Sequence, residues 1–400
     1  MSTENKNMPR LRFPGFTGEW VEKKLGEVCK SIRTGRLDAN AMVEGGEYRF
    51  YTCAKDYSYI DSYEFEGDCI MIAGNGAHLG YVHHYNGKFN AYQRTYVLND
   101  FTCESNYLEY CIRHFLPNRI ALEKKEGNTP YIVLSTLTDM VLSFPSNLAE
   151  QQKIAECLTA IDDLIVAQCK KVDALKEHKK GLMQQLFPQQ GETTPRLRFP
   201  GFTGEWVEKK LGEVSERVSV GLATSVTPYY RDKGVVMFRN LNIKPGFLDD
   251  TDILYLDETF ADENPSKKIH TDDVLTVHTG YVGISCVVPQ KYEGALTFTT
   301  LVTTTKKQIL NPQFLCCYLN STEGAKEIQI LQAGGGRNNL NVNDFILFRI
   351  PLPPILAEQQ KIAECLSTLD EQIKVESAEL DALKEHKKGL MQQLFPQPSK

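Results

Sequence analysis

Three segments of this 400-residue chain contain residue types that could do chemistry, and all three fail on spacing or context. The run Gly74-Asn75-Gly76-Ala77-His78-Leu79-Gly80 is close to a dinucleotide-binding glycine loop, but its spacing is one residue too long. The β-rich letters YVHHY follow it, where that motif needs a helix N-terminus to hold phosphate. His83 and His84 are adjacent in a predicted strand, so their side chains point to opposite faces instead of converging on a metal ion.

A third segment, Asn128-Thr129-Pro130-Tyr131, is similar to the Asn-Pro-Pro-Tyr of amino-methyltransferases. No convincing glycine-rich cofactor loop accompanies it, and the chain has no P-loop, nucleophile elbow or acidic metal cluster. We therefore expect no catalytic residues, no metal site and no cofactor in this chain.

Polar loops remain, and they are rich in Asn, Gln, Thr, Arg, His and Tyr. These side chains can read base edges, since Arg pairs with guanine, Asn or Gln with adenine, and Thr with either base or with the thymine methyl. A single loop Asn or Arg is usually only solvated, because loops lie at the surface. The hypothesis of DNA reading therefore depends on how the loops are arranged along the chain.

The composition is that of a folded protein, with 42% hydrophobic and 24% charged residues. The formal net charge of −6 counts against a nucleic-acid partner, since DNA-binding domains are usually basic. No window approaches 18 uncharged apolar residues, and the start of the chain is polar, so we expect no membrane association and a cytoplasmic location. The 11 cysteines include no C-x-x-C, which argues against a disulfide framework or a zinc ribbon.

Internal duplication is the most informative feature of the sequence. Three blocks recur letter for letter: PRLRFPGFTGEWVEKKLGEV at 9–28 and 195–214, LAEQQKIAECL at 148–158 and 356–366, and DALKEHKKGLMQQLFPQ at 173–189 and 381–397. Between them lie two variable stretches, 29–147 and 215–355, each large enough for a domain. Two long units argue against a solenoid and favour a pseudo-dimer with a shared framework.

The repeated blocks include two long helices, because residues 150–187 and their second copy have no internal proline. Eight of ten heptad core positions in each copy are apolar, which is typical of a coiled coil. We predict an antiparallel pair, roughly 57 Å long at 1.5 Å per residue. A parallel pair, or a helix packed on its own domain, is the alternative. The apolar core residues are Ile154, Leu158, Ile161, Ile165, Val172, Leu175, Leu182 and Leu186 in the first copy, and Ile362, Leu366, Leu369, Ile373, Leu380, Leu383, Leu390 and Leu394 in the second.

The polar exceptions at these core positions fall in the same layers of both copies. They are Gln168 and Lys179 in the first helix, and Glu376 and Lys387 in the second. A polar core residue lowers stability but fixes the register and the choice of partner.

The variable stretches share an order of elements despite low identity. Each has short β-rich runs broken by Gly and Asn, then a helical piece, then a polar loop marked by glycine. The β-rich runs are 67–98 and 272–304, the helical pieces 106–122 and 312–331, and the loops 126–135 and 334–344. We therefore predict an α+β fold.

The chain resembles the DNA specificity subunit of type I restriction-modification systems. The resemblance rests on PLPPILAEQQKIAECL at 351–366, on SFPSNLAEQQKIAECL at 143–158, and on the duplicated LRFPGF…EW…KLGEV openings. It covers essentially all of the chain. The first copy departs from the usual Pro-Leu-Pro-Pro at Phe144, Ser146 and Asn147, which affects only the turn into the first helix.

The resemblance implies two globular target-recognition domains joined by an antiparallel coiled coil, with pseudo-twofold symmetry. The first domain spans 1–147 with a conserved N-terminal segment at 1–28, and the first helix 148–190. The second domain spans 191–355 with its repeated segment at 195–214, and the second helix 356–400.

The family's function follows as an expectation. The chain would be a non-catalytic subunit that reads a bipartite target in double-stranded DNA. Two methyltransferase subunits and two restriction and translocase subunits would supply catalysis, with S-adenosylmethionine, ATP and Mg bound in those partners. A duplicated coiled-coil scaffold that never reads DNA, or a solitary methyltransferase, is the alternative.

Transferred by position, the resemblance also implies candidate DNA-reading residues. In the first domain these are Tyr51, Thr52, Asn75, His78, Gln93, Arg94, Asn128, Thr129 and Tyr131. In the second they are Arg239, Asn240, Asn242, His278, Thr279, Tyr281, Thr297, Thr299, Arg337, Asn338 and Asn339.

The variable stretches are themselves slightly acidic, with 11 basic against 14 acidic residues in 29–147 and 13 against 15 in 215–355. We therefore expect basic partner subunits to supply much of the contact with DNA phosphates, and this chain to supply discrimination.

Overall fold

The computed structural model describes residues 8–123, 131–335 and 339–396. The structure divides into two compact units. Unit 1 contains Met1–Gln168 together with Glu379–Lys400, and unit 2 contains Cys169–Ala378. Each unit therefore includes segments from both copies of the repeat.

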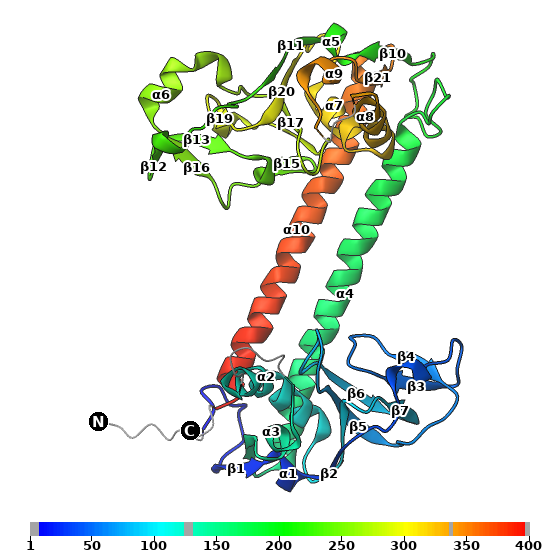
Figure 1. The fold of residues 1–400 in the computed structure, drawn as a ribbon, viewed down its shortest axis with the longest axis vertical. Coiled ribbons are helices and arrows are strands. Elements are labelled where there is room, and N and C mark those ends of the chain that lie inside the picture. Colours follow the sequence, from blue (N-terminus) through cyan, green and yellow to red (C-terminus); the bar gives the residue numbers. More distant parts are fainter. Residues whose placement is uncertain (1–7, 124–130, 336–338, 397–400) are drawn as a thin grey trace. The chain divides into compact units, whose positions relative to one another are not determined.

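Unit 1 is built on a four-stranded sheet in the order β2-β8-β5-β6 (Figure 1). A three-stranded sheet, β4-β3-β7, and a two-stranded pair, β1-β9, complete it. The central strand β5 carries the continuous apolar run that a strand covered on both faces requires. The elements are β1 Trp20–Lys24, α1 Leu25–Val28, β2 Cys29–Thr34, β3 Tyr48–Tyr51, β4 Ser58–Ile60, β5 Asp68–Ala73, β6 Val82–Asn86, β7 Phe89–Ala91, β8 Thr95–Phe101, α2 Ser105–Glu123, α3 Leu134–Thr138, β9 Val141–Pro145 and α4 Leu148–Leu186, which continues into unit 2.

Unit 2 repeats this topology with the sheet order β11-β20-β17-β18. A second sheet, β12-β16-β13-β19, corresponds to β4-β3-β7 with one added strand, and β10-β21 corresponds to β1-β9. The elements are β10 Val207–Lys210, α5 Leu211–Val214, β11 Ser215–Val220, β12 Tyr230–Arg231, β13 Val235–Phe238, β14 Ile243–Lys244, β15 Phe247–Leu248, β16 Leu254–Leu256, α6 Glu258–Glu263, β17 Val274–Val277, β18 Ser285–Val287, β19 Leu296–Thr297, β20 Thr300–Thr305, α7 Pro312–Leu319, α8 Thr322–Gly335, α9 Val342–Phe345, β21 Arg349–Leu352 and α10 Leu356–Leu394. The α+β fold is confirmed.

One helix prediction is wrong, since residues 312–331 form two helices, α7 and α8. Ser321 lies at the break, where its hydroxyl donates to the Tyr318 carbonyl at 2.6 Å and accepts from the Gly324 amide at 3.0 Å. The Asn320 amide donates to the Cys316 carbonyl at 2.9 Å. These bonds end one helix and cap the next, which hydrophobic periodicity does not reveal.

The long helices α4 and α10 are present as predicted, at 39 residues each. Asn147 begins α4, because its side-chain oxygen accepts from the Ala149 amide at 2.9 Å. The departure from Pro-Leu-Pro-Pro in the first copy thus supplies a helix cap.

Contacts within each unit show that α4 and α10 run antiparallel. In unit 1, Lys387 Nζ lies 2.5 Å from Asp162 Oδ1, and Gln168 contacts Glu379 at 3.4 Å, so partner numbers fall as residue numbers rise. In unit 2, Lys179 Nζ lies 2.5 Å from Asp370 Oδ1. Lys387 and Lys179, at equivalent core positions of the two copies, therefore form matched ion pairs with Asp162 and Asp370.

The predicted apolar core positions of both helices are all buried or half-buried. Those that are buried are Ile154, Leu158, Val172, Leu186, Ile362, Leu366, Leu380 and Leu394. Those that are half-buried are Ile161, Ile165, Leu175, Leu182, Leu369, Ile373, Leu383 and Leu390.

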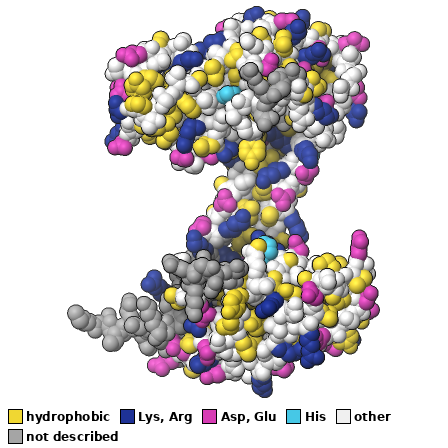
Figure 2. Space-filling view, in the orientation of Figure 1, with side chains coloured by type: hydrophobic (Ala, Val, Ile, Leu, Met, Phe, Trp, Pro, Cys, Tyr) yellow, Lys and Arg dark blue, Asp and Glu magenta, His cyan; other side chains and the backbone are white. Residues whose placement is uncertain are grey.

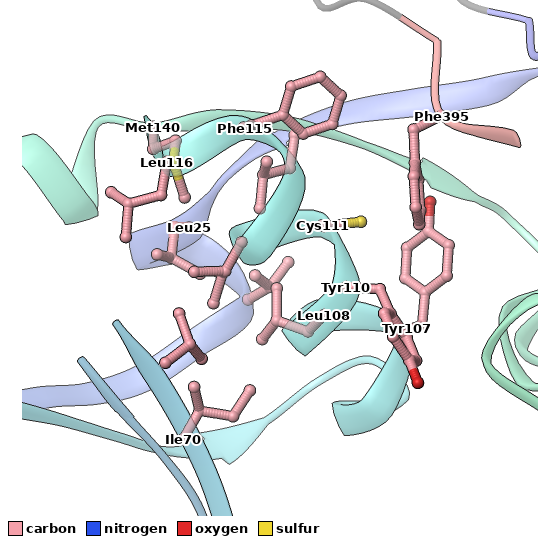
Figure 3. Packing of buried hydrophobic residues seen from close by; sticks show 14 of the residues in the cluster. Leu25, Ile70, Tyr107, Leu108, Tyr110, Cys111, Phe115, Leu116, Met140 and Phe395 are labelled. Carbon is pink, nitrogen blue, oxygen red and sulfur yellow. The ribbon is translucent and has the colours of Figure 1, made fainter. Parts of the chain in front are cut away.

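The core of unit 1 is completed by the end of α10, which belongs to the second copy of the repeat. Phe395 is 1% exposed, and its ring centroid lies 5.6 Å from that of Tyr107 (Figure 3). In unit 2 the equivalent Phe187, from the first copy, lies 5.5 Å from Phe314. The letter-identical LFP ends thus occupy equivalent places in the two cores.

The repeated N-terminal segments attach to the helix starts in the same way in both units. Arg12 donates to both carboxylate oxygens of Glu150 at 2.7 Å, and Arg198 donates to those of Glu358 at 2.7 and 2.8 Å. Both glutamates are 1% exposed, so each ion pair needs this bidentate geometry to offset its desolvation. The blocks that are identical between the copies are therefore blocks that bind one another.

We predict that Phe395→Ala destabilises unit 1 by about 3–5 kcal/mol, because it removes a fully buried ring and leaves a cavity. Each unit holds one buried tryptophan, Trp20 in unit 1 and Trp206 in unit 2. Urea unfolding followed by fluorescence in single-tryptophan backgrounds should show a lower midpoint for Trp20 only. The matched variant Phe187→Ala should lower the midpoint for Trp206 only. Equal effects of either variant on both probes would contradict this division.

Candidate nucleic-acid interface

Backbone hydrogen bonds bring four distant loops of unit 1 together. The Tyr92 amide donates to the Tyr51 carbonyl at 3.0 Å, the Gly74 amide to the Arg94 carbonyl at 2.8 Å, and the Ile132 amide to the Gly74 carbonyl at 2.9 Å. We call residues 51–53, 74–80, 92–95 and 131–132 loop cluster 1. Its backbone is fixed by these bonds, so its side chains project from a defined platform.

Unit 2 assembles its loops through corresponding bonds. The Phe298 amide donates to the Phe238 carbonyl at 2.8 Å, and the Leu340 amide donates to the His278 carbonyl at 3.0 Å. We call residues 238–242, 277–283, 297–300 and 339–340 loop cluster 2. The backbone pattern is shared with loop cluster 1, whereas the side chains differ.

Most of the described candidate residues lie at the surface of these clusters. Tyr131 is 63% exposed and Tyr281 is 85% exposed. The other exposed candidates are Gln93, Arg94, Thr279 and Asn339, and the half-buried ones are Thr52, Asn75, His78, Arg239, Asn240, His278 and Thr299. Loop clusters 1 and 2 therefore each present several hydrogen-bonding side chains to solvent.

Three candidates are buried, and their selection as reading residues is corrected. Tyr51 is 2% exposed, Asn242 1% and Thr297 0%. The Asn242 amide donates to the Asp252 carbonyl at 2.8 Å, and the Thr297 hydroxyl donates to the Phe238 carbonyl at 3.3 Å. The hydrogen bonds of Asn242 and Thr297 support the loop backbone, as ring packing does at Tyr51, so none of the three can reach a base edge.

Arg239 and Asn240 are also engaged within unit 2. Arg239 forms an ion pair with Asp252 at 2.8 Å, and Asn240 accepts from the Thr300 hydroxyl at 3.1 Å. By contrast, no carboxylate partner of Arg94 is found among the described residues. Four further candidates, Asn128, Thr129, Arg337 and Asn338, lie outside the described part of the chain.

Sequence reasoning missed two glycines that let the loops meet. A Cβ at Gly35 would lie 1.8 Å from the Ala91 carbonyl oxygen, and one at Gly221 would lie 2.2 Å from that of Thr297. Any side chain there would push the strand end off its cluster. The sequence did contain a signal for these glycines. Gly35 and Gly221 each follow a strand and lie at the same distance after the two copies of the repeated block, 9–28 and 195–214.

Charges of both signs are mixed on the visible face of each unit (Figure 2). That face shows no continuous basic stripe of the kind that dominates non-specific DNA binding.

His83 and His84 point to opposite faces of β6, as predicted. His83 contacts the Ala54 carbonyl at 3.0 Å on one face. On the other face, His84 lies between Asp68 at 2.7 Å and Glu109 at 2.8 Å, beside a cavity of about 670 Å³. No cluster of three or more His, Cys, Asp or Glu side chains suited to a metal ion occurs within residues 8–123, 131–335 and 339–396.

The environment of His84 changes its protonation. Burial alone would lower its pKa, but the hydrogen bonds and charges of Glu109 and Asp68 outweigh burial, and the pKa is raised above 6.5. For Glu109, burial would raise the pKa, but His84 and Arg113 outweigh it and the pKa is lowered. Both pKa shifts favour the state in which His84 is protonated and Glu109 is ionised.

The two units define a duplicated α+β protein in which one framework carries two different loop clusters. Residues 17–176 and 203–385 match the family described as the type I restriction modification DNA specificity domain, and the chain belongs to this family. No helix in the described part of the chain is long and apolar enough to cross a membrane.

Named relatives agree with this family. The chain is 34% identical to the type I restriction enzyme EcoDI specificity subunit of Escherichia coli over 186 residues, which cover 45% of this chain and 40% of that protein. It is 26% identical over 404 residues to the putative type I restriction enzyme MjaX specificity subunit of Methanocaldococcus jannaschii, covering 98% of this chain and 88% of that one. The chain thus spans less than half of the EcoDI subunit.

A solved structure shows the same fold. The type I restriction-modification S subunit from M. genitalium matches with a TM-score of 0.67 at 16% identity, covering 98% of this chain and all of that one. At this identity the likeness concerns the fold alone.

We predict that the stability of unit 1 depends on His84 protonation. Because the folded-state pKa is raised, its stabilisation should be complete below pH 6.5 and lost as the pH rises through the raised value. Urea midpoints reported by Trp20 should therefore fall over that range in the parent chain and fall less in His84→Gln. The control His386→Gln, exposed on α10, should behave like the parent. A His84→Gln profile identical to that of the parent would contradict the assignment.

Proposed function

We propose that this chain is the subunit that reads a bipartite DNA target for a type I restriction-modification complex, with one half of the target read by each unit. The observation that carries the proposal is the pair of loop clusters, which share backbone hydrogen bonds but carry different side chains. The two units share one backbone framework but present different side chains on it. This arrangement suits a protein that must recognise two different DNA sequences.

The exposed side chains supply the chemistry for direct readout. Loop cluster 1 offers Gln93 and Arg94, and loop cluster 2 offers Thr279 and Asn339. Arginine can donate two hydrogen bonds to guanine, and Asn or Gln can exchange two with adenine. The antiparallel helices would set the spacer between the two half-sites.

We place catalysis in the partners. Two of the segments that imitate motifs are used for structure, since the Gly74 amide and carbonyl hold loop cluster 1 together and both adjacent histidines are engaged locally. Two methyltransferase subunits would bind the repeated segments and methylate adenine with S-adenosylmethionine. Two restriction and translocase subunits would use ATP and Mg. The complex would act on double-stranded DNA in the cytoplasm.

The partners would also supply much of the contact with phosphates, because both variable stretches are slightly acidic. A duplicated scaffold without DNA readout is the competing function, and point variants in the loop clusters distinguish the two.

We predict that replacing residues 29–147 with the first variable stretch of another family member changes one half of the methylated sequence only. Loop cluster 1 lies within that stretch, whereas loop cluster 2 does not. Mapping methylated adenines in DNA from cells carrying the chain and its methyltransferase partner measures this directly. The matched exchange of 215–355 should change only the other half. A change in both halves, or in neither, would refute modular reading.

We further predict that Arg94→Ala relaxes discrimination in the first half-site and Asn339→Ala in the second. Loss of a bidentate base contact costs about 1–3 kcal/mol. Competition binding of the complex to duplexes substituted at single positions measures the loss, and each variant is the control for the other. The scaffold function requires that neither variant affects DNA binding.

A further inference from the structure

A second feature of unit 1 borders loop cluster 1 and has no part in the proposed reading of bases. Arg49 on β3 is stacked between two tyrosine rings, with its guanidinium carbon 4.4 Å from the centroid of Tyr57 and 4.2 Å from that of Tyr85. It also donates to the Tyr51 hydroxyl at 3.3 Å. These contacts fix the position of the guanidinium without neutralising its charge.

The strand register places an exposed tyrosine beside Arg49, which is itself half-buried, as is Tyr85. Arg49 pairs with Tyr59 of β4, so both side chains lie on the same side of the β4-β3-β7 sheet. Tyr59 and Tyr57 have ring centroids 5.6 Å apart, and they are 44% and 38% exposed. We call Arg49, Tyr57, Tyr59 and Tyr85 the Arg-Tyr face.

The Arg-Tyr face is continuous with loop cluster 1. Tyr51 lies 5.9 Å from Tyr57 between ring centroids, and its carbonyl accepts from the Tyr92 amide of the cluster. Two residues further on, the Cys53 thiol donates to the Arg94 carbonyl at 3.4 Å. A ligand that reaches the reading loops therefore meets this face next.

Arg49 differs from most described arginines of unit 1 because it has no carboxylate partner among the described residues. Arg12 pairs with Glu150, Arg33 with Glu64, Arg113 with Glu109 and Arg119 with Glu123. Unit 2 has no counterpart, because Val236 pairs with Tyr255 at the matching register position. In a slightly acidic stretch, a cation kept free of carboxylates and bordered by hydroxyl donors suits an anionic ligand.

We propose that the Arg-Tyr face binds the phosphate backbone of the duplex that flanks the half-site read by loop cluster 1. This inference rests on the proposed function. The guanidinium is held by the rings of Tyr57 and Tyr85 and by its bond to the Tyr51 hydroxyl, so it is fixed on a strand and does not extend into a groove as a loop side chain can. Its remaining N–H groups and the tyrosine hydroxyls instead suit phosphate oxygens, which position a protein on DNA without specifying sequence.

The test compares Arg49→Val with the parent, because valine occupies the matching position in unit 2. The full-length chain is assembled with its methyltransferase partner. Its affinity for a labelled duplex carrying the mapped target, and for a scrambled duplex, is measured by fluorescence anisotropy at several salt concentrations. Arg49→Val should reduce the slope of log K against log salt by about 1 and weaken binding several-fold on both duplexes. The methylated sequence should stay the same.

Two control variants separate charge from folding. Lys30→Ala removes one positive charge from an exposed position at the start of β2, outside the repeated blocks and at the opposite end of that strand from Gly35, and should leave the slope unchanged. Arg49→Lys keeps the charge and should retain the slope. The Trp20 unfolding midpoint should confirm that each variant is folded.

An Arg49→Val slope equal to that of Lys30→Ala overturns the inference. A loss of affinity confined to the target duplex, or an altered methylated sequence, also overturns the inference, since either result would mean that Arg49 reads bases. The proposed function fails separately if the parent complex binds the target no more tightly than the scrambled duplex.

Discussion

Each unit depends on a core that its own copy of the repeat cannot complete. Phe395 closes the core of unit 1 against Tyr107, and Phe187 closes that of unit 2 against Phe314. Burial of a phenylalanine ring is worth a large fraction of the net stability of a domain. The same LFP segment fits both cores although the aromatic rings it meets differ, with Tyr107 in unit 1 and Phe314 in unit 2. The LFP letters are identical in the two copies, whereas the variable stretches supply different partners.

This constraint leaves the loop clusters free to differ. Their positions are set largely by backbone hydrogen bonds, such as those of Gly74 and His278, which do not depend on the exposed side chains of the loops. Side chains such as Arg94 and Asn339 can therefore change without disturbing the framework. A protein that must acquire new recognition while keeping one assembly geometry gains from this separation. The Arg-Tyr face adds to this separation of framework from recognition, because its side chains lie on strands outside the loops and contact DNA in unit 1 alone.

Much of the framework could be predicted from the sequence. The heptads from Ile154 to Leu186 predicted the long helices, since a period of 3.5 residues specifies one buried seam. The helix predicted at 312–331 was wrong because Ser321 breaks it with local hydrogen bonds. Residue type selected Tyr51, Asn242 and Thr297 as readers, yet all three are buried. Composition does not tell whether a hydrogen-bonding side chain is used inside the protein or presented to a ligand.

The sequence by itself determined the duplication, the α+β class, the family and the two helices, because repetition and periodicity are local properties of the letters. Only the tertiary structure decided that each core is closed by the other copy's helix end, that α4 and α10 run antiparallel within each unit, and that four distant loops meet in each unit. It also placed Arg49 between Tyr57 and Tyr85. These outcomes depend on contacts between residues far apart in the chain, and such pairings leave no periodic signal in a single sequence.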